Sequence, residues 1–372
     1  MNLKQFLEQK PLYYSEIDYT RMPKAYNSIK SALNIPKIVH IIGTNGKGTT
    51  GRYIASAILK AGFSTGHYTS PHILKFNERI WIDGDDVSDE VLETAHKKLL
   101  ELLEKEYLET LSYFEYTTLL AMVVFEGVDY VVLEAGLGGE WDATAVFENI
   151  LTVVTPIGFD HQDFLGNDIE KIATTKLNAI SKHAIVAKQP HGEVYEIAKR
   201  VADKKGVEVV FAKDFVFKAD LLQPLYLQEN LHLSQLALDF LKIPYTKDSF
   251  KDAKMFGRLS KIADNVLVDV GHNPLSASRI CESLKPKRYV LIYNSYKDKD
   301  YNSILTILKP IIKRVEIIDI DDVRIVDKEN LVESLNKLNI RYKDFSSLNR
   351  VEDYLVFGSF VVVEEFLKAY NE

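Results

Sequence analysis

The chain has 372 residues, enough for two domains or one large one, and its 46% of hydrophobic and 27% of charged residues are typical of globular proteins. Its formal net charge of −7 argues against a nucleic-acid partner. The single cysteine, Cys281, excludes an internal disulfide, and neither a signal-peptide pattern nor a membrane-spanning apolar run is present, so we expect a cytoplasmic protein without a membrane partner.

The first signal of function lies at 38–50, after a segment, 1–36, that is predicted to be helical and amphipathic. An apolar run leads into a glycine-rich turn, a lysine and two threonines, a pattern that favours a strand, a phosphate loop and a helix start. Lys47 would supply positive charge to the β and γ phosphates. The strict phosphate-loop pattern is not met, because Ile41 replaces its first glycine and Gly48 stands where a hydroxyl should follow the lysine. An ordinary strand–helix turn is therefore the alternative at this point.

Polar residues follow the next predicted strand, at 63–68. The segment 69–72 comes at the carboxyl end of this strand, where α/β proteins bind ligands. The polar segment 76–79 continues the loop, although a solvated loop explains it equally well. Helices are predicted from Ser88 to about Tyr107 and over 116–125, the second preceded by Tyr113, Phe114 and Glu115.

Two later strands end in residues that suit a metal or a phosphate. The strand 129–134 is almost wholly apolar, which predicts burial on both faces in a parallel sheet. Its last residue, Glu134, needs a metal or a cationic ligand if it is buried, and phosphate-loop proteins hold Mg²⁺ with such a carboxylate. The strand 150–155 leads into the segment 160–163, where two aspartates flank His161. This cluster indicates phosphate or metal contacts, with a structural histidine as the alternative.

The rest of the chain continues the alternation of strands and helices. Predicted elements are a helix that starts at Asp168 and contains Lys176, strands near 183–187 and 206–211, helices near 193–203 and 228–241, and later strands at 265–270, 288–293, 315–320 and 360–363. By itself, Lys176 would be a surface lysine. The polar segment 242–254 is predicted to be a linker. The alternation predicts an α/β fold with largely parallel sheets, divided into domains 1–254 and 255–372.

A set of motifs, in order along the chain, resembles one family. The motifs are GTNGKGT at 43–49, TSPH at 69–72, FNERI at 76–80, YFE at 113–115, LEAGLGG at 133–139, IGFDHQ at 157–162, FGRL at 256–259, DVGHNP at 269–274, DKD at 298–300 and GSFVVVEEFL at 358–367. From about residue 20 to its end, the chain is similar to folylpolyglutamate synthase and dihydrofolate synthase, within the Mur ligase superfamily. The resemblance implies a Mur-ligase-like ATPase domain with a phosphate loop over 1–254 and a smaller, Rossmann-like glutamate-ligase domain over 255–372.

The resemblance also implies a reaction. ATP phosphorylates a carboxylate, and the amino group of L-glutamate then attacks the acyl phosphate to form an amide. The carboxylate would belong to dihydropteroate and to reduced folates such as tetrahydrofolate, and the enzyme would act as a monomer. Phosphoryl transfer chiefly needs positioning and neutralisation of phosphate charge, which the residues above could supply.

The matching positions imply roles for individual residues. ATP would be bound by Asn45, Gly46, Lys47, Gly48, Thr49, Asn230, Arg258, Asp269 and His272. Two Mg²⁺ sites are implied, the first with Ser70 and Glu134 and the second with His161. Lys176 would be carbamylated and, like His161, catalytic. The pterin-bearing substrate would lie near Thr69, Phe76, Arg79, Tyr113, Phe114 and Glu115. Ser70 would then provide the hydroxyl that is missing after Lys47.

The chain departs from the family pattern at several positions. Glu140 stands where relatives often have arginine, Ala145 where asparagine is usual, Phe256 where proline is usual, Ser260 where glutamate is common, and Leu177 and Asn178 where Ala-Gly is frequent. None of these changes removes an ATP or metal group. They therefore bear on the substrate pocket and on specificity.

Two other functions are alternatives. A different Mur-type ligase would act on a nucleotide-linked peptidoglycan precursor, but such ligases usually carry an additional N-terminal domain, for which the segment 1–36 leaves no room. A nucleotide-binding switch protein would hydrolyse ATP without ligating anything, and the departures at Glu140 and Ala145 motivate this second alternative.

Overall fold

The computed structural model describes residues 1–11, 18–213 and 224–371, which form two compact units. The first unit comprises 1–157, 168–216 and 230–254, and the second comprises 158–167, 217–229 and 255–372. The helix α10 (Leu225–Leu241) contributes to both, because the division falls between Glu229 and Asn230. No helix within the described residues combines the length and apolarity needed to cross a membrane.

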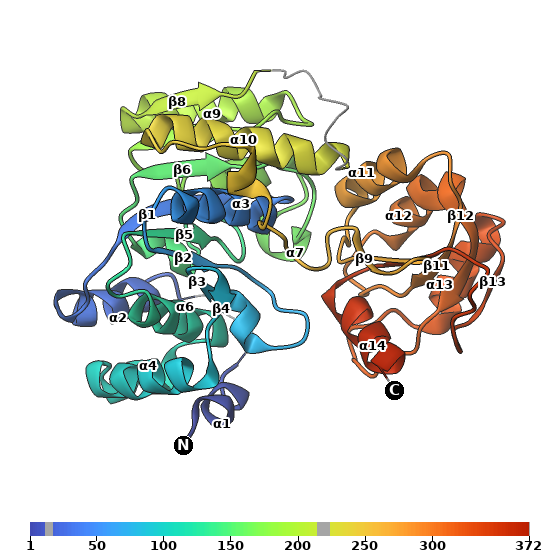
Figure 1. Ribbon diagram of the computed structural model, residues 1–372, viewed down its shortest axis with the longest axis horizontal. Coiled ribbons are helices and arrows are strands. Elements are labelled where there is room, and N and C mark those ends of the chain that lie inside the picture. Colours follow the sequence, from blue (N-terminus) through green and yellow to red (C-terminus); the bar gives the residue numbers. More distant parts are fainter. Residues whose placement is uncertain (12–17, 214–223, 372) are drawn as a thin grey trace. The chain divides into compact units, whose positions relative to one another are not determined.

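The first unit is built on a sheet of eight strands in the order β4-β3-β2-β5-β1-β6-β7-β8 (Figure 1). The strands are β1 (Lys37–Ile42), β2 (Thr65–Tyr68), β3 (Ile80–Ile82), β4 (Asp85–Asp86), β5 (Tyr130–Glu134), β6 (Leu151–Val154), β7 (His183–Val186) and β8 (Glu208–Phe211). From β2 to β8 all neighbours are parallel, whereas β3 and β4 are antiparallel additions. β1 lies between β5 and β6, so the segments that follow these three strands meet at one edge.

Helices cover both faces of this sheet. Besides α10, they are α1 (Leu3–Glu8), α2 (Arg21–Ile29), α3 (Lys47–Lys60), α4 (Asp89–Leu102), α5 (Lys105–Thr110), α6 (Tyr113–Val124), α8 (Ile169–Leu177) and α9 (Glu193–Lys205). Alternate residues of β5 belong to opposite cores: Val131 and Leu133 pack with α1, α2, α4 and α6, and Val132 packs with α3 and α10. The predicted burial of this strand on both faces is confirmed.

The second unit has a six-stranded sheet in the order β13-β12-β11-β14-β10-β9, in which only β9 is antiparallel to its neighbour. Its strands are β9 (Ser260–Ala263), β10 (Val266–Asp269), β11 (Tyr289–Tyr293), β12 (Ile312–Ile317), β13 (Tyr342–Asp344) and β14 (Tyr354–Phe357). Its helices are α7 (Gln162–Leu165), α11 (Pro274–Leu284), α12 (Tyr301–Leu308), α13 (Lys328–Lys337) and α14 (Phe360–Asn371). Short 3₁₀ helices in the chain are η1 (Lys30–Ala32), η2 (Phe76–Arg79), η3 (Ala143–Val146), η4 (Lys247–Phe250) and η5 (Lys309–Ile311). The predicted α/β class with largely parallel sheets is confirmed.

The predicted strand at 360–363 is wrong, because these residues begin helix α14 and the adjacent strand is β14. The hydroxyl of Ser359 accepts the N–H of Val362 at 3.3 Å, which satisfies a donor of the first helical turn. Val362 and Phe366, four residues apart, are both fully buried, as on one face of a helix.

Other predictions need smaller corrections. The helix capped by Ser88 ends at Leu102 rather than near Tyr107, because Leu103 and Glu104 are extended before α5 begins. The helix expected from 116 begins at Tyr113, so the YFE motif forms its first turn. The segment 242–254 is not a free linker, because Ile243, Phe250 and Ala253 are buried in the core beside α3.

Candidate functional site

The predicted strand, glycine-rich turn and helix start are confirmed, because β1 ends at Ile42 and α3 begins at Lys47. Gly43 has φ +137° and Gly46 has φ +87°, values that L side chains rarely adopt. A Cβ atom at Gly46 would also lie 2.6 Å from Oδ1 of Asn230. The loop is anchored because the N–H of Thr44 donates to the carbonyl of Pro156 at 3.0 Å, and that of Asn45 does so at 3.3 Å. This tight turn leads directly into the first turn of α3, which begins at Lys47.

The first turn of α3 presents the features of an anion site. Lys47, Gly48 and Thr49 open a helix of 14 residues, whose N-terminal amides and dipole favour a negative charge. Thr49 and Thr50 are buried, and their hydroxyls have no hydrogen-bond partner within the described part of the chain. A buried hydroxyl without a partner is unfavourable, so a bound oxyanion or a hydrated cation would satisfy it.

Lys47, Thr69 and Glu134 meet at the edge formed by β1, β5 and β2. Glu134 is only 4% exposed, and one of its carboxylate oxygens, Oε1, lies 3.8 Å from Nζ of Lys47. The other, Oε2, accepts a short hydrogen bond from the hydroxyl of Thr69. The ammonium of Lys47 also donates to the carbonyl of Thr44 at 3.2 Å. Three residues that the sequence analysis assigned to three different motifs thus share one small polar cluster.

The donors beside this cluster suit Mg²⁺. Ser70 follows Thr69 directly and is partly buried. A single carboxylate and a hydroxyl leave several coordination positions to water and phosphate, which is how proteins usually bind Mg²⁺. Among the residues that the structure describes, no three His, Cys, Asp or Glu side chains gather as a closed metal cage. The predicted ligands Ser70 and Glu134 belong to the first unit and His161 to the second.

Lys176 is buried rather than exposed, contrary to what its position on a helix suggests. It lies in the last turn of α8, is 4% exposed and donates from Nζ to the carbonyl of Gly43 at 3.0 Å. A Cβ atom at Gly139 would lie 2.5 Å from the carbonyl oxygen of Lys176, so the loop after Glu134 packs directly on this turn. Lys176 therefore belongs to the interior of the first unit, directly beside the turn that begins at Gly43.

Two departures from the family pattern contact each other. The carboxylate of Glu140 accepts a hydrogen bond from the side-chain amide of Asn178 at 2.7 Å, and the backbone N–H of Glu140 donates to the carbonyl of Thr175 at 2.9 Å. Both bonds join the loop after β5 to the turn of α8 that carries Lys176. Glu140 and Asn178 are therefore direct partners in this fold.

Arg79 contacts two of the other residues predicted to bind the substrate, Phe76 and Tyr113. It is buried, and its Nε donates to Nδ1 of His72 at 2.8 Å. Its guanidinium lies 5.3 Å from the ring centroid of Tyr113 and 5.9 Å from that of Phe76. Burial, with a further effect from Arg79, lowers the pKa of His72 to about 4, so His72 accepts this bond as a neutral ring at pH 7.

Phe114 and Glu115 are held in different ways. The ring of Phe114 lies so close to Gly136 that a Cβ atom there would be 2.5 Å away. Glu115 closes a capping box with Ser112 and forms an ion pair with Arg21, whose Nη2 is 2.8 Å from the carboxylate. The partner Arg21, 94 residues away, gave no signal in the sequence.

In the second unit, Arg258 precedes β9, Asp269 is the last residue of β10, and His272 follows β10. The buried carboxylate of Asp269 accepts the N–H groups of Leu259 and Gly271 at 2.9 and 2.8 Å. Burial raises its pKa. Arg258 donates to the carbonyl of Gly257 at 3.0 Å. The hydroxyl of Ser260, one of the departures, accepts the N–H of Gly257 at 3.0 Å and so orders the turn that carries Arg258.

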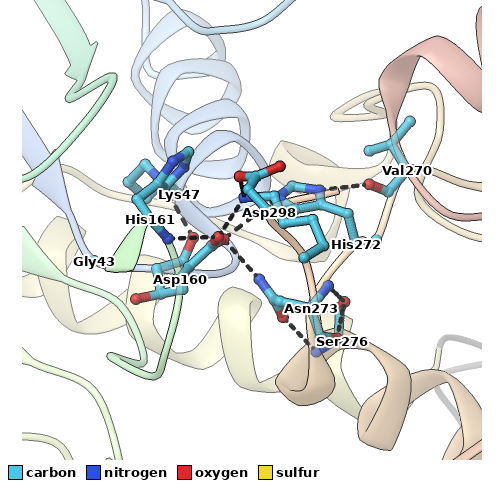
Figure 2. A network of polar contacts seen from close by, with 12 residues as sticks. Gly43, Lys47, Asp160, His161, Val270, His272, Asn273, Ser276 and Asp298 are labelled. Atoms are coloured by element: carbon cyan, nitrogen blue, oxygen red, sulfur yellow. Dashed lines mark hydrogen bonds and ion pairs between the residues drawn. The ribbon is translucent and has the colours of Figure 1, made fainter. Parts of the chain in front are cut away.

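Asp160 is the centre of a buried polar network in the second unit (Figure 2). Its carboxylate accepts the backbone N–H of His161 at 2.9 Å and the side-chain amide of Asn273 at 3.0 Å. Nε2 of His272 lies 3.3 Å away, and Nζ of Lys299 lies 2.8 Å away. Burial acts to raise the pKa of Asp160, but the hydrogen bond and charge of His272, with the charges of His161 and Lys299, hold that pKa well below its usual range.

Comparison with known proteins identifies the family. Over 327 residues the chain is 31% identical to the dihydrofolate synthase/folylpolyglutamate synthase of Bacillus subtilis (strain 168). The aligned residues make up 76% of this chain and 76% of that protein. The chain belongs to the dihydrofolate synthase/folylpolyglutamate synthase family. This membership confirms the family that the ordered motifs resemble, and with it the class of ATP-dependent ligase and the fold. No family model matches the chain.

Solved structures of similar proteins agree with this family. The crystal structure of Helicobacter pylori folylpolyglutamate synthetase matches with a TM-score of 0.81 and 37% identity, over 99% of this chain and 98% of that one. E. coli FolC, in complex with DHPP and ADP, matches with a TM-score of 0.85 and 26% identity, over 100% and 98% of the two chains. The likeness extends over both units.

Proposed function

We propose that this member of the dihydrofolate synthase/folylpolyglutamate synthase family joins L-glutamate to dihydropteroate and to reduced folates, through an acyl phosphate made with ATP. The observation that carries the proposal is the cluster of Lys47, Thr69 and Glu134 beside a glycine-dependent loop at the start of α3. The ADP and DHPP bound to the similar E. coli FolC support a nucleotide and a pterin-type substrate here.

The first chemical task is to hold the phosphates. The backbone amides at 45–49 and the ammonium of Lys47 would neutralise phosphate charge, which is the principal requirement of phosphoryl transfer. Asn230 would contribute from α10, and Arg258, Asp269 and His272 from the second unit. The boundary at 254 would then separate an ATP-binding domain from a glutamate-ligase domain.

The second task is to hold the metal ions. Ser70 and Glu134 would hold one Mg²⁺, and His161, together with carbamylated Lys176, would position a second. When bound, these ions supply positive charge to the phosphate oxygens as charge develops there. The burial of Lys176 beside the carbonyl of Gly43 is what supports a carbamate at this position.

The third task is to bind the carboxylate substrate. Thr69 and the cluster of Phe76, Arg79 and Tyr113, with Phe114 and Glu115 on the same helix turn, would form its binding surface. Aromatic rings suit a pterin by stacking, and a buried guanidinium suits its polar edge or the carboxylate. The single cysteine of the chain supports work in a reducing cytoplasm, and the enzyme would act as a monomer.

The test is a panel of substrates with purified protein. ADP release is measured with dihydropteroate, dihydrofolate and tetrahydrofolate, each with and without L-glutamate, and the products are weighed by mass spectrometry. We expect ADP release that requires both substrates and a product heavier by one glutamyl residue. ATP turnover without a glutamylated product would instead indicate a nucleotide-dependent switch, and activity with a UDP-linked precursor would indicate another Mur-type ligase.

A further inference from the structure

Lys299 is a buried cation to which the proposed reaction assigns no role. It lies between β11 and α12 in the second unit, and its side chain is only 8% exposed. Its Nζ atom lies 2.8 Å from Oδ1 of Asp160 and 3.3 Å from Oδ2 of Asp298. A lysine is rarely buried unless it is paired, so this contact is a specific feature of the fold.

The contact reaches the turn that carries His161. This residue has φ +50°, in the left-handed region that is unfavourable for residues other than glycine. The same Oδ1 atom of Asp160 that faces Lys299 also accepts the backbone N–H of His161 at 2.9 Å. The carboxylate therefore holds a strained backbone conformation, and the ammonium of Lys299 fixes the carboxylate.

The other carboxylate oxygen has its own partners. Oδ2 of Asp160 accepts the side-chain amide of Asn273 at 3.0 Å and lies 3.3 Å from Nε2 of His272 (Figure 2). Nδ1 of His272 is directed to the carbonyl of Val270 at 3.0 Å, and Oδ1 of Asn273 accepts the N–H of Ser276 in the first turn of α11. With both oxygens engaged, Asp160 has a single orientation, and Lys299 supplies the buried positive charge that this orientation needs.

We propose that Lys299 is a positioning residue for His161, acting through Asp160. The inference rests on the proposed function, in which His161 serves a metal ion. Without the ammonium, Asp160 keeps a buried negative charge with less compensation, and its hold on the His161 turn weakens. The metal requirement then rises, whereas the phosphate loop, which lies in the other unit, keeps its contacts with ATP.

The matched control is Lys297, two residues earlier. Its side chain is 50% exposed, and it pairs with Asp327 at 3.3 Å on the surface, where an ion pair contributes little. Lys299→Met removes the charge and keeps most of the apolar stem, and Lys297→Met does the same at the exposed position. Lys299→Arg restores a cation at the buried position.

The experiment measures the Mg²⁺ concentration that gives half-maximal ligase activity, and the KM for ATP at saturating Mg²⁺. It also measures Mn²⁺ affinity from the free Mn²⁺ signal in electron paramagnetic resonance, with a non-hydrolysable ATP analogue present. For Lys299→Met we expect the half-maximal Mg²⁺ concentration to rise about tenfold and the Mn²⁺ affinity to fall about tenfold. Effects of this size are found when a group that orients a metal ligand is removed. The KM for ATP should stay within about twofold, Lys297→Met should match the wild type, and Lys299→Arg should recover part of the loss.

A metal dependence of Lys299→Met equal to that of Lys297→Met would overturn the inference. If Lys299→Met does not fold, judged by its thermal transition, Asp160→Asn replaces it, and an unchanged metal dependence there would overturn the inference equally. A wild-type protein without ligase activity would instead count against the proposed function. The Mn²⁺ measurement would still compare Lys299 with Lys297 in that case.

Discussion

Replacement of Lys176 by alanine tests whether this lysine has a catalytic role or only a structural one. The variant loses the bond from Nζ to the carbonyl of Gly43, which is worth about 1 kcal/mol net, but it also removes the cost of burying an amine. In a unit of this size, 1 kcal/mol moves the thermal midpoint by roughly 2–4 °C. We therefore expect a small change in stability.

The loss of activity should be far larger. If Lys176 carries a carbamate that positions a metal, its removal should lower kcat by at least about 100-fold, as when one group that stabilises developing charge is removed. Lys176→Met keeps most of the buried apolar stem but lacks the amine. It should show the same loss of activity, which would attribute the loss to the amine rather than to packing. Acetate or formate should restore part of the rate, because each supplies a small carboxylate to the vacated space.

The assay is ADP release with dihydropteroate, Mg²⁺ and glutamate, run beside a thermal melt. The control is Lys171→Ala on the same helix, since Lys171 is 72% exposed and pairs with Asp168 at 3.2 Å. That variant should be nearly silent in both measurements. Full activity of Lys176→Ala, or an equal loss in Lys171→Ala, would refute the reasoning.

Three further predictions follow from the first unit. Glu134→Ala should raise the Mg²⁺ requirement by about tenfold or more, because a metal with few protein ligands loses its carboxylate; an unchanged Mg²⁺ titration would contradict this. Gly46→Ala places a Cβ atom 2.6 Å from Asn230 at φ +87°, so nucleotide affinity measured by calorimetry should fall at least tenfold, as judged roughly from the loss of one well-placed hydrogen-bonding group. Gly84→Ala is the control, because Gly84 has φ +122° but no neighbour within 4 Å of an added Cβ atom. This variant introduces backbone strain without a side-chain clash and should bind nucleotide normally. Burial lowers the pKa of His40 to about 4, below its unfolded value of 6.5, so stability is lost as the pH falls from about 6.5 towards 4. Between pH 7 and pH 4.5, His40→Gln should lose less of its free energy of unfolding, measured with urea, than the wild type does. An identical loss in both proteins would show that His40 is not responsible.

Local patterns predicted much of the fold. The glycine-rich turn before α3, the strand ending at Glu134 and the helix starts at Ser88 and Asp168 all depend on neighbouring residues, and the structure has each of them. The error at 360–363 has an equally local cause. A run of four apolar residues fits a buried strand or a buried helix, and its periodicity is too short to distinguish them.

Contacts between distant residues could not be predicted. Arg21 and Glu115 are 94 positions apart, and Asp160 and Lys299 are 139 apart, so neither pair leaves a spacing signal. The burial of Lys176 likewise depends on how Gly139 and Gly43 pack around it, which is a property of three segments together. The partners of these residues are set by the folded chain rather than by neighbouring positions in the sequence.

The path of the chain between the two units has a consequence for dividing the protein. The segment 158–167 belongs to the second unit, although the residues on either side of it belong to the first. A chain cut after Lys254 would keep Asp160 but lose Asn273 and Lys299, leaving a carboxylate without the groups that surround it. A chain that starts at Met255 would have the opposite defect. The two halves are therefore poor candidates for separate expression, and an exchange of C-terminal halves between relatives should succeed only when the 158–167 segment is exchanged with them.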